Sequence, residues 1–175
     1  MTPFHGYGAA MAEHADHELT AAEAAVLLHA TRDALAAAGA LGGSLGTPLG
    51  SFGGARGGAA GGRFGARFTR PRTAAATLEV TQGPEAVREL ARRAIADRGA
   101  VIDDPNAAGD NAVWGLVGSG ALDMVPALVR VAVEPVADGG SRVHVRATGR
   151  EGLIKQRIGA KAVDRVCEAI ARTGR

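Results

Sequence analysis

The chain contains a single cysteine, Cys167, so no disulfide can form within it. A reducing compartment suits such a chain. Its first residues, 1–12, lack both the basic start and the apolar stretch of a secretory signal. No apolar run approaches the roughly 20 residues that a membrane-spanning helix needs. We therefore expect a soluble, cytoplasmic protein without a membrane span.

Aromatic residues are also scarce, at 3% of the chain, whereas hydrophobic residues reach 46%. Any core must therefore be built from Ala, Val, Leu and Ile. The net charge is only +2 with His counted as neutral, which argues against nucleic acid as the partner of the whole chain. We expect no cofactor, because no motif for one is present.

Residues 20–39 have the features of a helix, and the tail before it, 1–19, shows no periodicity. Thr20 is a favourable N-cap, and Glu23 follows three residues later, which completes a capping box. Gly39 is expected to end the helix.

Segment 40–72 is dominated by Gly and Arg and has no acidic residue. Such a composition cannot bury enough apolar surface to offset the loss of backbone entropy. We expect a flexible linker. The helix before it is then either only tethered, or it docks on the main domain or on a second copy of the chain.

Residues 73–175 are predicted to form one α+β domain of order β-α-β-β-β-β-α. The predicted strands are 75–81, 100–103, 112–117, 124–136 and 142–148, and the predicted helices are 84–98 and 151–173. Two helices on one face of an antiparallel sheet make a two-layer sandwich.

The last two strands have their odd-numbered apolar residues on the same face, so the loop between them must have an odd length. A three-residue turn over 137–139, with Gly139 in the left-handed conformation, satisfies this condition. It would place Arg130 opposite Arg146 and Glu134 opposite Arg142.

Several sequence features carry a resemblance to known folds: Ala-Thr-Leu-Glu-Val within 75–80, Gly-Pro-Glu-Ala-Val at 83–87, Ala-Val-Ile-Asp-Asp-Pro at 100–105, the turn at 138–140 and the long terminal helix. About 100 residues resemble small bacterial domains of the TATA-binding-protein-like and helix-grip type. They are similar to uncharacterised domains and to repeats of an outer-membrane-assembly lipoprotein, and more loosely to the START/polyketide-cyclase superfamily. The chain has fewer strands than START proteins and lacks the lipoprotein's signal and lipidation cysteine. The resemblance implies a binding or scaffolding domain rather than an enzyme.

The polar face of the predicted sheet is the first candidate site. Like charges directly opposite each other are unfavourable, so Arg130 and Arg146 could be placed to hold an anion. The alternative is a solvated polar face with the two arginines splayed apart. The candidate ligand or partner residues are Glu79, Trp114, Arg130, Glu134, Arg142, His144 and Arg146.

The Gly/Arg segment is the second candidate, because arginine and phenylalanine interleaved with glycine can bind single-stranded nucleic acid weakly. Its basic residues are Arg56, Arg63, Arg67, Arg70 and Arg72. The alternative is a plain linker. No phosphate-loop signature is present, because no Gly-Lys-Ser/Thr follows the glycines.

The remaining chemical groups have simpler interpretations, and we predict no catalytic or metal-binding residue. His14 and His17 lie one turn apart, but no other ligand completes a metal site with them or with His5 and His29. Asp103, Asp104 and Asp110 suit a turn, Cys167 suits a core helix, and Ser119 lacks a nucleophile motif.

The favoured function is a non-enzymatic binding or assembly module that contacts a protein or a small amphiphile through the sheet face or the helix–sheet groove. A second copy of the chain is one candidate partner. The first alternative is a cyclase- or hydrolase-like enzyme that uses His144, Glu79 or Glu134 as acid/base groups. The second is weak polyanion binding through 56–72.

Overall fold

The computed structural model describes residues 12–13, 18–45, 59–61, 63–107, 111–119, 124–152 and 156–173. Most of the predicted tail and part of the predicted linker lie outside these residues. The predictions for His5, His14, His17, Arg56 and Asp110 also lie outside them, as does the side chain of Arg67.

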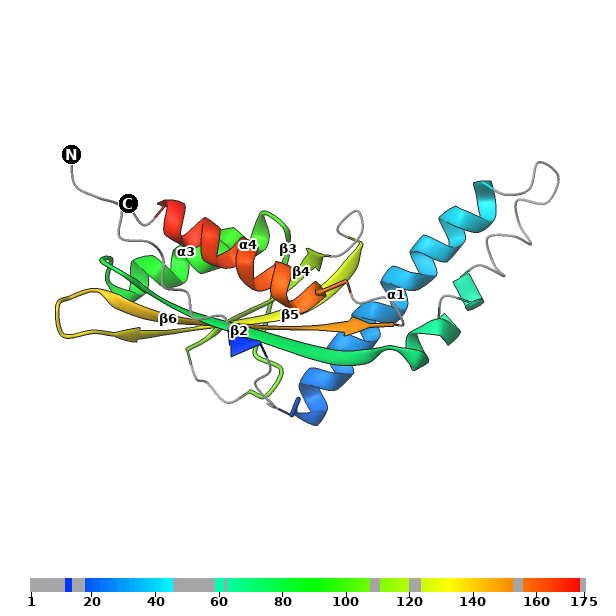
Figure 1. Ribbon diagram of the computed structural model, residues 1–175, viewed down its shortest axis with the longest axis horizontal. Helices are drawn as coiled ribbons and strands as arrows, with labels where there is room; N and C mark the ends of the chain where they lie inside the picture. Colours follow the sequence, from blue (N-terminus) through cyan, green and yellow to red (C-terminus); the bar gives the residue numbers. More distant parts are fainter. Residues whose placement is uncertain are drawn as a thin grey trace.

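The fold is an α+β sandwich around one antiparallel sheet, as predicted (Figure 1). In the described residues the sheet has the strand order β1-β2-β6-β5-β4-β3. Its strands are β1 (Ala12–Glu13), β2 (Arg70–Val80), β3 (Gly99–Ile102), β4 (Val113–Ser119), β5 (Val125–Pro135) and β6 (Ser141–Glu151). The helical elements are α1 (Ala21–Leu45), the short 3-10 helix η1 (Ala66–Phe68), α3 (Pro84–Ala96) and α4 (Ile158–Thr173).

The β5–β6 hairpin has the predicted register. Arg130 lies opposite Arg146 and Glu134 opposite Arg142. The turn closes with the Val136 amide donating to the Gly140 carbonyl at 3.1 Å. Gly139 has φ +79°, the left-handed conformation that glycine adopts at low cost. The parity of the apolar residues and one glycine were therefore enough to fix this pairing.

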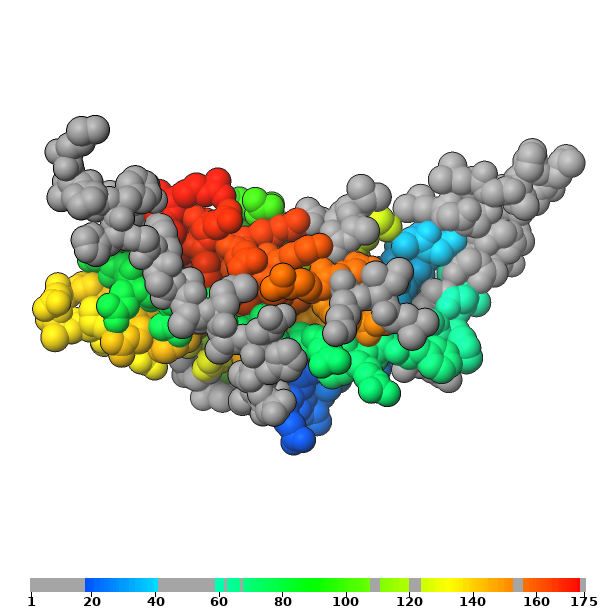
Figure 2. Space-filling view, in the orientation of Figure 1, coloured from blue at the N-terminus to red at the C-terminus, as the bar shows by residue number. Residues whose placement is uncertain are grey.

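One face of the sheet, called the inner face below, is covered by α3 and α4 and holds the main core (Figure 1). Small aliphatic side chains alternate along β2, β5 and β6 and meet the apolar stripes of both helices. Gly149 of β6 allows close approach, because a Cβ there would lie 2.3 Å from Cγ2 of Ile158. The space-filling view shows α4 lying across this side of the molecule (Figure 2).

The opposite face, called the outer face, is partly covered by α1, which packs on β5 and β6. A second, smaller core forms there from Leu27, Trp114 and Leu128. Partly buried side chains surround it: Leu19, Val26, Ile102, Ala112 and Leu116. Of the alternatives for the first helix, the structure shows docking on the domain of its own chain.

Four predicted limits of elements were wrong by three residues or more. The first helix passes through Gly39 to Leu45, because Gly39 keeps a negative or extended φ and does not form the left-handed cap. Strand β2 begins at Arg70 rather than 75, because its first residues pair with the end of β6. The last helix begins at Ile158 rather than 151, and the preceding Arg157 has φ +53°. Glu151 instead ends β6 and accepts a hydrogen bond from the Ile158 amide at 2.7 Å.

Candidate helix-docking site

The start of α1 contains the predicted capping box. The Glu23 amide donates to Oγ1 of Thr20 at 3.2 Å, and the Thr20 amide donates to Oε2 of Glu23 at 3.0 Å. These two bonds satisfy backbone donors that a helix start leaves without partners. Glu23 nevertheless is only 1% exposed, which is unusual for a carboxylate in the first turn of a helix.

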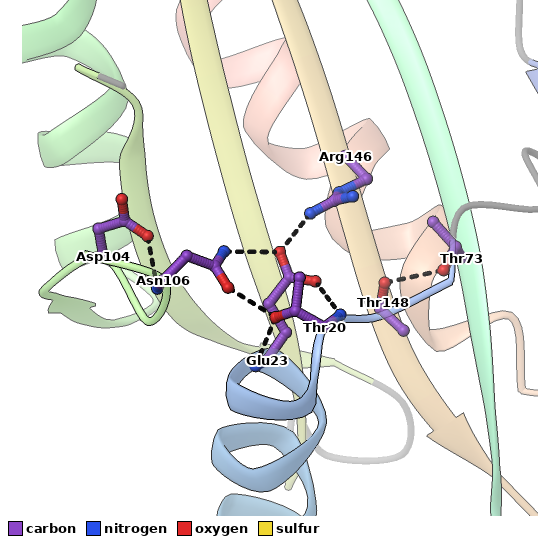
Figure 3. Close-up of polar contacts among 7 residues, drawn as sticks. All are labelled: Thr20, Glu23, Thr73, Asp104, Asn106, Arg146 and Thr148. Carbon is purple, nitrogen blue, oxygen red and sulfur yellow. Dashed lines mark hydrogen bonds and ion pairs between the residues drawn. The ribbon is translucent and has the colours of Figure 1, made fainter. Parts of the chain in front are cut away.

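The second carboxylate oxygen of Glu23 explains this burial (Figure 3). Oε1 accepts a hydrogen bond from Nη2 of Arg146, on β6, at 2.6 Å. Asn106, in the turn after β3, donates its Nδ2 to the same oxygen at 3.4 Å. A buried carboxylate is tolerated when it is paired with a cation and hydrogen-bonded through both oxygens, as here.

Asn106 also binds the N-cap residue of the helix. Its Oδ1 accepts a hydrogen bond from Oγ1 of Thr20 at 2.6 Å. The backbone amide of Asn106 donates to Oδ1 of Asp104 at 2.8 Å. This bond stabilises the turn from which the Asn106 side chain projects. The helix start is thus held by a β-strand and by a separate loop (Figure 3).

Beneath this polar cluster lies Trp114, which is 2% exposed. The guanidinium carbons of Arg130 and Arg146 lie 5.7 and 5.9 Å from the centre of its ring, within cation–π range. Leu27 and Leu128 contribute the apolar part of the same cluster. Nε1 of Trp114 is buried without a hydrogen-bond acceptor in the described part of the chain. We call Trp114, Leu128, Arg130, Arg146 and Asn106 the helix-docking site.

Arg130 lies opposite Arg146 as predicted, and Arg146 forms an ion pair with Glu23 of the same chain. Arg146 binds Glu23, and both guanidinium groups lie over Trp114. Trp114, predicted above as a ligand or partner residue of the polar face, belongs to a core, and this core lies under α1 rather than under α3 and α4.

The other predicted residues of the polar face lie near the β5–β6 hairpin, apart from the helix-docking site. Arg142 donates from Nε and Nη2 to Oε1 of Glu79 at 3.1 and 2.8 Å. His144 lies 3.7 Å from a carboxylate oxygen of Glu134 and 3.0 Å from Oγ1 of Thr77. We call Glu79, Glu134, Arg142 and His144 the open polar zone, because their side chains are 42–63% exposed.

Within the Gly/Arg segment, the described arginine side chains are exposed: Arg63, Arg70 and Arg72. Phe64 and Phe68 are exposed too, and their rings meet edge to face with centroids 5.3 Å apart. The described arginine side chains and both phenylalanine rings of this segment are therefore accessible to solvent.

The minor candidates have structural partners. Burial and, to a lesser extent, the nearby carboxylates of Asp164 and Glu168 raise the pKa of the Cys167 thiol to about 12. Such a thiol is unreactive at neutral pH, which fits core packing. Ser119 is buried and donates to the Ile158 carbonyl at 3.0 Å. His29 lies 3.4 Å from Asp33 on the exposed side of α1. The described ranges contain no group of three or more metal-ligating side chains.

Thr20, Glu23, Leu27, Leu128 and Asn106 were missed as site residues. The capping box was visible in the sequence, but it signals only a helix start. Asn106 was explained by ordinary turn chemistry. No local signal connects a helix cap to a strand 123 residues later.

No protein-family model matches the chain, and a search of curated proteins finds no match. Among the described helices, none is both long enough and apolar enough to cross a lipid bilayer.

Proposed function

We propose that the protein is a non-enzymatic binding or assembly module whose outer sheet face binds an amphipathic helix with an acidic first turn. In the present structure α1 is the resident occupant of this site. The observation that carries the proposal is the buried Glu23 carboxylate, which bonds to its own helix cap and to Arg146 at once.

This arrangement selects for shape as well as charge. Arg146 and Asn106 bind a carboxylate oxygen, and Trp114 and Leu128 accept an apolar side chain one turn further along the helix. On a helix, a carboxylate and a leucine four residues apart are neighbours about 6 Å apart, whereas on an extended strand they would lie about 13 Å apart. The site therefore favours a helical ligand over an extended peptide, as in other helix-in-groove complexes.

A partner helix of the same pattern would compete with α1. In sequence, α1 is followed by a segment rich in glycine, 46–62, so α1 could leave the site while the domain behind it stays folded. Among the side chains that the structure describes, none from α1 belongs to the main core, which supports this separation.

A cleavage and exchange experiment tests the proposal on the full chain. A protease site is placed between residues 50 and 54 of the folded protein, which is then cut and mixed with a labelled peptide of residues 18–45. We expect the peptide to replace the resident helix. Emission from Trp114, the only tryptophan of the chain, reports whether the site is covered.

Matched peptides make the result specific. Glu23→Gln and Leu27→Ala peptides should compete at least tenfold more weakly, whereas His29→Ala, altered on the exposed side, should compete like the parent peptide. Equal competition by all four peptides would exclude the helix-docking site as the contact. Retention of the resident helix with no exchange at any peptide concentration would exclude displacement.

Weak polyanion binding remains a second proposal, favoured by the exposed Phe64–Phe68 pair beside Arg63. Bases stack on such rings, and the arginines add a salt-dependent attraction. A labelled single-stranded oligonucleotide should bind the full chain at low salt, and a Phe64→Ala/Phe68→Ala variant should lose most of that affinity. Equal binding by both proteins would rule out this contact. The proposal of an acid/base enzyme gains no support from the open polar zone, because its side chains are solvated and paired.

A further inference from the structure

Strand β3 forms one edge of the sheet, next to β4. In the described part of the chain no other strand pairs with its second side. Its residues Gly99, Ala100 and Val101 are exposed, and Val101, at 44%, is one of four exposed large hydrophobic side chains among the described residues. An open strand edge of this kind can pair with another strand.

The hydrogen-bond pattern defines which groups are available. The Gly118 amide donates to the Arg98 carbonyl at 3.1 Å, and Ala100 lies opposite Leu116 in the same antiparallel ladder. Bonded and non-bonded pairs alternate in such a ladder, so the backbone groups of residues 98, 100 and 102 face β4. Those of 99, 101 and 103 face away from it.

This alternation restricts how two copies of β3 can pair around a two-fold axis. Outward-facing residues must meet outward-facing residues, so the axis must pass through a residue rather than between two. An axis at Val101 places Val101 opposite its counterpart and Gly99 opposite Asp103. It also places Arg98 opposite Asp104, a favourable cross-strand charge pair.

The register with its axis at Ala100 is less favourable, both for the charge pairs and for the burial of Val101. An axis at Ala100 would put Asp97 opposite Asp103, two like charges, and would leave Val101 opposite the side-chain-free Gly99. The Val101-centred register alone combines charge complementarity with burial of the exposed valine.

We infer that β3 is a self-association edge, through which two copies of the chain form a continuous antiparallel sheet centred on Val101. The interface is short, so the dimer is weak and forms reversibly with concentration. This inference does not rest on the proposed helix binding, although Asp104, the partner of Arg98 in the dimer, also accepts a hydrogen bond from the backbone amide of Asn106.

Cysteine cross-linking tests the register in the full chain. Val101→Cys should give a disulfide-linked dimer under mild oxidation, because opposite residues of an antiparallel pair lie within bridging distance. Met124→Cys, at another exposed position, should give little dimer. The wild type should give none, because Cys167 is partly buried against the main core. Equal cross-linking at positions 101 and 124 would overturn the inference.

Sedimentation equilibrium tests the contact without cross-links. The wild-type protein should show reversible dimer formation as its concentration approaches about 1 mM. Val101→Pro removes only an outward-facing amide, so the fold should persist, with Trp114 emission unchanged, while the dimer disappears. Arg98→Glu should weaken the dimer roughly tenfold. A wild type that is monomeric throughout, or a Val101→Pro variant that still dimerises, would overturn the inference.

Discussion

The outer face of the sheet carries two arginine–carboxylate pairs of similar geometry in different surroundings. Arg146 binds Glu23 at 2.6 Å, and Arg142 binds Glu79 at 2.8 Å. The side chains of the first pair are 17% and 2% exposed, and those of the second are 47% and 63% exposed. The helix-docking site and the open polar zone thus contain the same kind of ion pair with different degrees of burial. The degree of burial determines how much each pair contributes to stability.

An exposed pair gains little, because water solvates both charges when they separate. A buried pair is different: if one partner is removed, the other stays desolvated and unpaired. The burial of Glu23 therefore makes the docking of α1 dependent on Arg146 in a way that no residue of the open polar zone could match.

The largest effect is expected for Arg146→Ala, which leaves the Glu23 carboxylate buried without a cation. The docked state should lose about 3–5 kcal/mol, enough to release α1. Trp114 emission should shift to longer wavelength, while the far-ultraviolet signal of the sheet persists. A Glu23→Leu/Arg146→Met variant should recover most of the docking, since it removes both charges together. If the double variant behaved like Arg146→Ala, the ion pair would not be the relevant contact.

Leu27→Ala should come next, because this side chain is fully buried against Trp114 and Leu128. We expect a loss of about 2–4 kcal/mol from the docked state, by lost transfer energy and a new cavity. Urea titrations followed by Trp114 emission measure it. Leu28→Ala, at a half-buried position on the same helix, is the control and should lose less.

On the inner face, the expected effect is a pH dependence of the free energy of unfolding, which does not involve the docking of α1. The pKa of the Cys167 thiol is raised to about 12 from an ordinary 9.0, so the folded protein keeps a proton that the unfolded chain releases. The free energy of unfolding should therefore be unaffected below pH 9 and fall between about pH 9 and 12. Cys167→Ala should flatten this slope in chemical denaturation curves. Arg146→Ala should leave the slope unchanged, and a change would mean that the two faces are coupled.

The smallest effect is expected for Arg142→Ala in the open polar zone. Its pair with Glu79 is solvated, so the free energy of unfolding should fall by about 0.5 kcal/mol or less. Added salt should reduce even this difference. A loss as large as that of Arg146→Ala would show that burial is not what separates the two zones.

Local sequence rules predicted much of the sheet. The odd-numbered apolar residues of β5 and β6, together with Gly139, were sufficient for their register, because strand periodicity and turn geometry act over a few residues. The capping box at Thr20 and Glu23 was equally local.

The rest depended on contacts between distant segments. The extension of β2 to Arg70 follows from its pairing with Glu151, and the same pairing moves the start of α4 to Ile158. The burial of Glu23 depends on Arg146 and Asn106, neither of which is near it in sequence. From its sequence alone, a helix with a polar first turn is predicted to be solvent-exposed there. Its burial becomes evident only when the sheet on which it docks is known.

The distance of 123 residues between Glu23 and Arg146 has a consequence for biosynthesis. Chains are synthesised from the N-terminus, so α1 leaves the ribosome long before β6 exists. Throughout that interval Leu27 and its neighbours have no surface to cover, whereas the β5–β6 hairpin can close as soon as it emerges. Helix α1 therefore stays without its docking surface until β6 has been synthesised, and during that interval its apolar residues are open to wrong contacts.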